Sequence, residues 1–435
     1  MAKHLIVISV DAMVYEDLEY CKTLPNFSRI INNASLIERV LTIYPSVTHS
    51  VHATIISGNP AGITGIVNNY IFKHEAPESS KWYNDFSQIQ CETILHLAKR
   101  AGLTVAASSW PLNCGGQEYI DYLIPNAMDM DFVGREDDPI SVYRGLGAGE
   151  NVVPIIQEAL KTMTYENKHP EVDDFQTYCA AEIIKKFKPN LLLTHPGYVD
   201  AARHRGGVFG EHVLNALDKI DEWLGMLLDA VRDAGIEETT DFVIVSDHGQ
   251  INISRAISPN VYLVDKGYIN LDKYGKIMQW SAFSKSAGAS AQVYLSDPFN
   301  RELYNSVYAL LLDMAKEGIY GFESVYTVEE TKERYGLYGD FSFVLETDGY
   351  TSFGDWVTRP SVRGFDFSDY KFGKGTHGHI PEKGPQPMLI AFGPSFKQGI
   401  VVPMGSILNH APTFAAVLGL KFKDTEGVPV YEILV

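Results

Sequence analysis

Residues 4–10 read His-Leu-Ile-Val-Ile-Ser-Val, and Asp11 follows directly. This short apolar run is rich in β-branched residues and predicts a buried strand. The same pattern recurs at 103–108, 190–194, 241–246 and 387–392. Helical patterns separate these runs, at 87–101, 151–163, 173–187 and 211–233. Strands that alternate with helices of this length predict an α/β fold with a mostly parallel central sheet and helices on both faces.

One long segment does not follow this alternation. Within residues 251–372 we predict a strand at 289–295, an amphipathic helix at 300–317, and short strands near 322–328 and 341–346. The chain then returns to the first pattern with the strand at 387–392 and a closing helix at 406–419. We therefore predict an α/β core made of residues 1–250 and 373–435, with a smaller α+β insertion, or cap domain, at 251–372.

The composition limits the class of partner. The 435 residues include 54 Asp+Glu against 36 Lys+Arg, which gives a net charge of −18. Such a charge argues against an extended surface for nucleic acid or for an anionic membrane. It does not argue against one anionic group held by bound metal ions, because such ions dominate the field in their own pocket. With neither a signal-peptide pattern nor an apolar run long enough to span a bilayer, we expect a cytoplasmic protein unless a leader has been removed.

Four short segments place Asp or His beside an apolar strand. They contain Asp11, then Asp200 with His204, then Asp247 with His248, and lastly His377 in Gly375-Thr-His-Gly-His379. In a parallel sheet the carboxyl ends of the strands gather ligand-binding residues at one edge. Carboxylate and imidazole are ligands that suit zinc and related divalent ions, and the four scattered cysteines offer no thiolate site. A lone Asp or His is more often a helix cap or a structural residue, but the joint occurrence of the four segments predicts a metal centre.

The segment Tyr44-Pro-Ser-Val-Thr48-His-Ser50 supplies candidates for a nucleophile. A loop containing Pro here leads into small polar residues that open a helix, with Thr48 at or near its first turn. The helix N-terminus favours negative charge, whether an alkoxide or a phosphate. A hydroxyl becomes an effective nucleophile when a divalent ion helps to remove its proton. Spacing alone does not choose among Ser46, Thr48 and Ser50.

The order of these motifs resembles the alkaline phosphatase superfamily and, within it, the type I phosphodiesterase/nucleotide pyrophosphatase family. The resemblance covers about 1–250 and 373–435. It implies that Asp200, His204 and His377 hold one zinc ion, and that Asp11, Asp247 and His248 hold the other. Thr48 would lie between the ions as their shared ligand and as the nucleophile. The side-chain amide of Asn69 would donate a hydrogen bond to a phosphoryl oxygen.

The resemblance implies a two-metal hydrolase of phosphodiesters or pyrophosphates, with a phosphothreonine intermediate and a small-molecule substrate such as a nucleotide. Manganese or cobalt are alternatives to the two zinc ions. This sequence departs from the family pattern at Val47, at His49 and at His195, where a lysine and two aromatic residues are common. Because of these departures, the resemblance does not identify the substrate. Trp110, by stacking on a base, and His49 are predicted substrate-binding residues.

Three other interpretations share the same residues. A phosphomonoesterase or a phosphonoacetate hydrolase would use the same scaffold on another substrate. Monoesterases often add a cation beside the nucleophile, whereas the sequence places no Lys or Arg next to Thr48. Phosphonoacetate hydrolases hold the substrate carboxylate with lysines near the site, whereas residues 101–125 contain no Lys or Arg. A protein of a different class would bind metal and phosphate without turnover. The complete set of ligands together with a nucleophile argues against that class.

Overall fold

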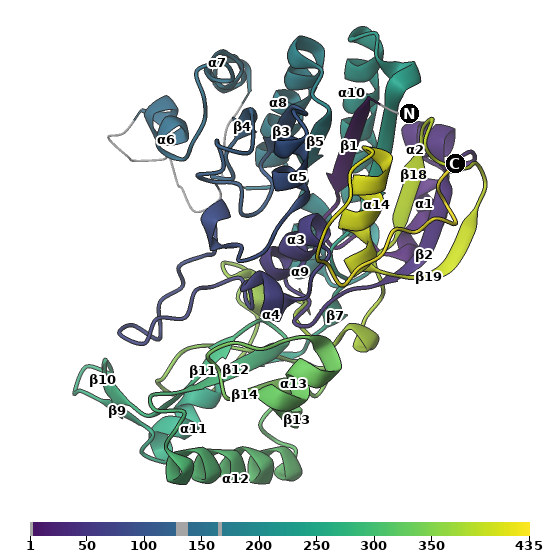
Figure 1. Ribbon diagram of the computed structural model, residues 1–435. Coiled ribbons are helices and arrows are strands. Elements are labelled where there is room, and N and C mark those ends of the chain that lie inside the picture. Colours follow the sequence, from purple (N-terminus) through teal and green to yellow (C-terminus); the bar gives the residue numbers. More distant parts are fainter. Residues whose placement is uncertain (1–2, 128–137, 164–167) are drawn as a thin grey trace.

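A computed structural model describes residues 3–127, 138–163 and 168–435. Its largest sheet has eight strands in the order β19-β2-β18-β6-β1-β5-β3-β4 (Figure 1). The strands are β1 (His4–Ser9), β2 (Ser35–Leu41), β3 (Val105–Ser108), β4 (Tyr122–Ile124), β5 (Leu191–Thr194), β6 (Thr240–Val245), β18 (Leu389–Phe392) and β19 (Val401–Ser406). All neighbours pair in parallel except β18, which is antiparallel to both β6 and β2. The predicted mostly parallel α/β fold is confirmed.

Helices cover both faces of this sheet, because alternate residues of its strands are buried on opposite sides. Leu5 and Val7 of β1 pack with one group of helices, α3 (Thr48–Ser57), α5 (Ile94–Arg100) and α14 (His410–Val417). Ile6 and Ile8 pack with the other group, α2 (Pro25–Ile31), α7 (Val153–Thr162), α8 (Glu171–Phe187) and α10 (Glu211–Asp233). Two apolar cores therefore hold the sheet rigid and fix the positions of its strand ends.

The predicted helix at 87–101 is shorter than expected. A 3-10 turn spans Phe86–Gln88, and α5 begins only at Ile94. Thr93 forms a capping box with His96, which ends the preceding loop and starts the helix. The closing helix at 406–419 likewise resolves into a 3-10 turn, Ile407–Asn409, and α14.

The remaining strands form smaller sheets, drawn in green below the main sheet in Figure 1. The largest has the order β11-β12-β14-β13, from β11 (Ala282–Ser286), β12 (Ser290–Leu295), β13 (Phe322–Thr327) and β14 (Phe343–Thr347). Helices α11 (Pro259–Asp265), α12 (Arg301–Glu317) and α13 (Val328–Tyr335) accompany this sheet. The separate apolar cluster of this region supports the division at 251–372, which we propose as the boundary of the insertion.

Candidate active site

The candidate metal ligands gather at one edge of the main sheet. Asp11 follows β1, Asp247 and His248 follow β6, and His377 follows β17 (Gly375–Thr376). Helix α9 (Tyr198–Gly206) follows β5 and carries Asp200 and His204. Because β1, β5 and β6 run in parallel, their carboxyl ends meet at the same edge, as the sequence pattern predicts.

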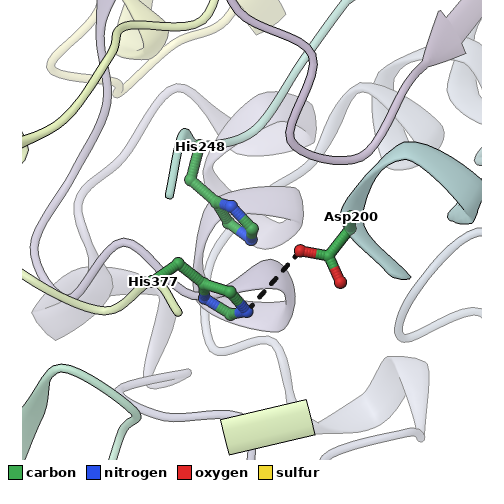
Figure 2. A group of neighbouring side chains, drawn as sticks. All are labelled: Asp200, His248 and His377. Atoms are coloured by element: carbon green, nitrogen blue, oxygen red, sulfur yellow. Dashed lines mark ion pairs between the residues drawn. The ribbon is translucent and has the colours of Figure 1, made fainter. Parts of the chain in front are cut away.

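Two groups of these side chains have ligand atoms close enough to share an ion. Asp11, Asp247 and His248 form one group, and Asp200, His248 and His377 form the other, each with its ligand atoms within 4.8 Å of one another. Figure 2 shows Asp200, His248 and His377 pointing toward one another. His204 lies beside the second group, with Nε2 3.2 Å from Asp200 Oδ2. The grouping differs from the expected one because His248 belongs to both groups, whereas His204 belongs to neither and contacts the second through Asp200 and the ring of His377, with ring centroids 5.2 Å apart.

The carboxylates of this cluster fit a divalent cation. Asp11 Oδ1 and Asp247 Oδ2 are buried, and neither accepts a hydrogen bond within the part of the chain that the structure describes. Burial raises the pKa of Asp11 well above its ordinary value, and the nearby Asp200 and Asp247 carboxylates raise it further. Buried carboxylate oxygens that accept no hydrogen bond are costly unless a positive charge compensates them, and the side chains nearest to these two are histidine rings. A bound cation would supply that charge.

The histidines of the cluster fit the same cation. The ring of His204 donates from Nδ1 to Gly375 O over 2.7 Å, and that of His377 donates from Nδ1 to Ser46 O over 3.0 Å. These bonds fix the tautomer, so that the lone pair of each ring lies on Nε2. Burial lowers the pKa of His377 to about 3, which keeps the ring neutral at pH 7 and able to bind a metal ion.

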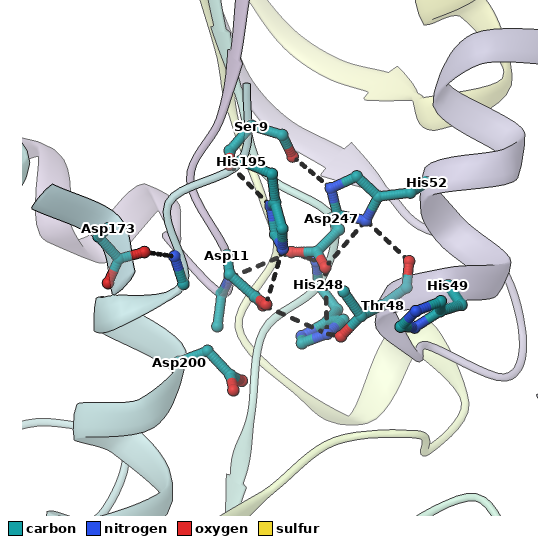
Figure 3. A network of polar contacts seen from close by, with 12 residues as sticks. Ser9, Asp11, Thr48, His49, His52, Asp173, His195, Asp200, Asp247 and His248 are labelled. Carbon is teal, nitrogen blue, oxygen red and sulfur yellow. Dashed lines mark hydrogen bonds and ion pairs between the residues drawn. The ribbon is translucent and has the colours of Figure 1, made fainter. Parts of the chain in front are cut away.

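Thr48 is the first residue of α3, whose preceding residue, Val47, provides no side-chain cap. Its hydroxyl oxygen lies 3.2 Å from His248 Nε2, the ring that belongs to both ligand groups (Figure 3). Of the three candidate hydroxyls, Thr48 alone lines the main cavity among the described residues. Ser46 instead donates to His379 O and accepts from Gly378 N, whereas the buried Ser50 hydroxyl has no hydrogen-bond partner within the described part of the chain.

Asn69 and His49 both line the cavity beside Thr48. Asn69 Oδ1 accepts a hydrogen bond from the backbone N–H of His49 over 2.9 Å, which fixes the orientation of the amide. The His49 ring lies 4.9 Å from the Trp82 ring, centroid to centroid, and Trp82 also lines the cavity. Trp82 was missed by sequence reasoning, because no strand or motif precedes it.

Trp110 is not among the described residues that line the cavity. Its side chain is 1% exposed and packs edge-on against His52, with ring centroids 4.8 Å apart. The neighbouring Pro111 lines the cavity in its place. In this position Trp110 supports the histidines behind the candidate ligands and presents no free face to a base.

A layer of polar contacts behind the ligands was also missed from the sequence. The His195 ring donates from Nδ1 to Ser9 O over 2.9 Å and places Nε2 3.2 Å from Asp11 Oδ2 (Figure 3). Gln250 donates to Asp200 Oδ1 over 2.5 Å. Such outer contacts orient the groups that meet a metal ion. In the sequence His195 stands out by its position directly after β5, three residues before the start of α9, and as a departure from the family pattern, but neither signal indicates its contact with Asp11.

The chain is similar in sequence to known phosphodiesterases. Rat ectonucleotide pyrophosphatase/phosphodiesterase family member 1 is 26% identical over 248 residues, which cover 56% of this chain and 23% of the rat protein. The venom phosphodiesterase of Naja atra is 23% identical over 262 residues, covering 58% of this chain and 26% of the venom protein. The matched part of this chain thus spans about a quarter of the length of these relatives.

The fold is that of a solved relative. The structure of murine ectonucleotide pyrophosphatase/phosphodiesterase 5, in an inactive form in complex with AMP, superposes with a TM-score of 0.67 at 19% identity and covers 100% of both chains. Within residues 3–127, 138–163 and 168–435, no helix has both the length and the apolar character needed to cross a bilayer. A family model matches residues 5–379, and this chain therefore belongs to the type I phosphodiesterase/nucleotide pyrophosphatase family.

Proposed function

We propose that this protein hydrolyses phosphodiester or pyrophosphate bonds of small molecules such as nucleotides, with Thr48 as the nucleophile between two divalent cations. The observation that carries the proposal is the position of the Thr48 hydroxyl, 3.2 Å from the imidazole that both ligand groups share. The names of the relatives and the AMP complex of the structural neighbour support a nucleotide-like substrate.

In this proposal Asp200, His204 and His377 hold one ion. The other is held by Asp11, Asp247 and His248. Bound zinc ions would lower the pKa of the Thr48 hydroxyl and neutralise charge on the phosphoryl oxygens. Manganese or cobalt suit the same donors, since the set contains carboxylate and imidazole but no thiolate.

The residues of the chain then perform two displacements. Thr48 Oγ1 attacks phosphorus in line with the leaving oxygen, the bond to that oxygen breaks, and a phosphothreonine forms. Water then attacks the same phosphorus, breaks its bond to Thr48 and releases the product. Backbone N–H groups of the first turn of α3 other than that of His49, which donates to Asn69 Oδ1, and the Nδ2 of Asn69 donate to the phosphoryl oxygens, where one lost donor costs on the order of 3 kcal/mol.

A substrate panel tests this function. Protein loaded with zinc should release nitrophenol from bis(4-nitrophenyl) phosphate faster than from 4-nitrophenyl phosphate. A preference for the monoester would favour a phosphomonoesterase, and turnover of phosphonoacetate alone would favour a phosphonate hydrolase. Binding of metal and AMP without turnover of any member of the panel would favour a protein that only binds phosphates.

A further inference from the structure

Two cationic side chains line the active-site cavity away from the candidate metal ligands. His169 lies just before α8, and Arg205 lies in the last turn of α9. The mechanism proposed above uses neither residue. Their neighbours on the same cavity wall include the apolar side chains of Pro111, Val172 and Phe175. This part of the cavity therefore combines positive charge with an apolar surface.

His169 is held in place by a buried carboxylate. Its Nδ1 lies 2.5 Å from Asp173 Oδ2, and the Asp173 side chain has no exposed surface. Asp173 Oδ1 accepts further hydrogen bonds from Gln176 Nε2 and from the backbone N–H of Gly197, both over 2.8 Å. Both carboxylate oxygens of Asp173 are thus engaged in polar contacts. The contact with Asp173 fixes the His169 ring so that its Nε2 atom can bind another partner.

Gly197 provides room for the His169 ring. A Cβ atom at this glycine would lie 2.7 Å from His169 Cε1, which is closer than such atoms approach. The ring therefore packs directly on the backbone that leads into α9. Because His169 is 20% exposed and lines the cavity, its free edge is accessible to a ligand.

Arg205 is exposed at the cavity and forms neither an ion pair nor a hydrogen bond with any described residue. Asp369, one of the acidic residues that line the cavity, lies 3.6 Å from Lys371 Nζ. Burial lowers the pKa of His169, but the Asp173 and Asp200 carboxylates together raise it above its ordinary value, and Arg205 opposes that rise. Arg205 and a protonated His169 therefore repel each other, and an anion between them would remove the repulsion.

We propose that His169 and Arg205 form a second anion-binding subsite, which takes a phosphate or carboxylate group of the substrate other than the phosphoryl group that reacts. This inference rests on the proposed function and narrows its substrate class. The substrate carries an anionic group joined to the reacting phosphodiester by an organic portion that fits the apolar wall. A guanidinium and an imidazole that both donate to anionic oxygens are suited to this recognition.

Three 4-nitrophenyl phosphodiesters test the subsite. Their second ester group is a plain alkyl chain, an alkyl chain ending in carboxylate, or an alkyl chain ending in phosphate. The unmodified protein should show a higher kcat/KM for at least one charged ester than for the plain ester, and the two charged esters distinguish carboxylate from phosphate. Arg205→Gln and His169→Gln should each lower that preference by about five- to tenfold, mainly through KM.

The plain ester is the internal control, because its turnover depends on the metal centre and Thr48 but not on the subsite. Arg205→Lys keeps the charge and should retain most of the preference. Arg301→Gln, an exposed arginine of α12, should change nothing. Turnover of all three esters at equal efficiency would overturn the subsite while leaving the proposed function intact.

Equilibrium binding separates the two proposals further. With Thr48→Ala, calorimetry should give a lower Kd for a charged ester than for the plain ester, and Arg205→Gln in the same background should abolish the difference. If the unmodified protein hydrolyses no ester, the proposed function fails, but this binding difference still decides the subsite. Equal Kd values for charged and plain esters would overturn it.

Discussion

Replacement of Ser46 by alanine should destabilise the loops around the active site while leaving Thr48, the proposed nucleophile, unchanged. The Ser46 hydroxyl is buried, donates to His379 O over 2.9 Å and accepts from Gly378 N over 3.1 Å. The backbone of Ser46 also accepts the hydrogen bond of the His377 ring. Ser46 therefore ties the loop before α3 to the loop that carries a candidate metal ligand.

The magnitude follows from those two bonds. Ser46→Ala leaves one buried carbonyl and one buried N–H without a partner, and each such group costs about 1–3 kcal/mol. We expect the free energy of unfolding to fall by about 2–4 kcal/mol, because neighbouring groups recover part of the loss. The affinity for zinc should also fall, since a displaced loop shifts His377.

Ser50→Ala is the matched control, because Ser50 is equally buried but its hydroxyl has no partner in the described part of the chain. The free energy of unfolding of Ser50→Ala should differ from that of the unmodified protein by less than about 1 kcal/mol. The assay is urea denaturation of the metal-free proteins, followed by zinc titration against a chromogenic chelator. Equal unfolding free energies and equal zinc affinities for the two variants would refute the reasoning.

Three further results are expected. Removal of metal by a chelator should lower the Tm and abolish phosphodiester turnover, with zinc restoring both better than magnesium, because the ligands are carboxylate and imidazole; full activity in a preparation free of transition metal would contradict the metal centre. Trp110→Ala should destabilise the fold by about 3–5 kcal/mol and change the turnover of all substrates alike. Trp82→Ala should raise KM chiefly for nucleotides. Kinetics on nucleotides and on plain aryl esters distinguish the two outcomes. Burial raises the pKa of Glu346 to about 7, above the 4.5 of the unfolded chain, so the stability that its protonated form contributes is present below pH 4.5 and is lost as the pH rises to 7. The unfolding free energy of Glu346→Gln, measured from pH 5 to pH 8, should lack this decline. The same pH dependence in the variant and the unmodified protein would contradict the raised pKa of Glu346.

The sequence predicts the main sheet well because buried parallel strands are continuous apolar runs. β1, β5 and β6 are of this kind, and each has a counterpart among the predicted strands. β2 was missed because only three of its seven residues are buried and Glu38 and Arg39 interrupt its apolar run. β19 was missed because it is a largely exposed edge strand with a proline.

The residues of the candidate site were predictable from the sequence to the extent that they follow such apolar strands. Residues that end strands, such as Asp11 and Asp247, are visible in the sequence because a polar residue there stands out against an apolar run. His169 and Asp173 do not stand out in this way: their mutual contact is local, four residues apart, but their place at the cavity depends on the long-range bond from Gly197 N–H to Asp173. The separation of Ser46 from Thr48 likewise depends on a long-range contact, with the loop at 377–379.

The most direct test of the central claim is the turnover of bis(4-nitrophenyl) phosphate by Thr48→Ala, measured together with the metal content of the same sample. The proposed mechanism predicts that both ions remain, because the six candidate ligands are unchanged, and that turnover falls by about a thousandfold or more. Thr48→Ser should retain much of the activity because it keeps the hydroxyl. Substantial turnover by metal-loaded Thr48→Ala would contradict the covalent mechanism and identify water as the attacking group.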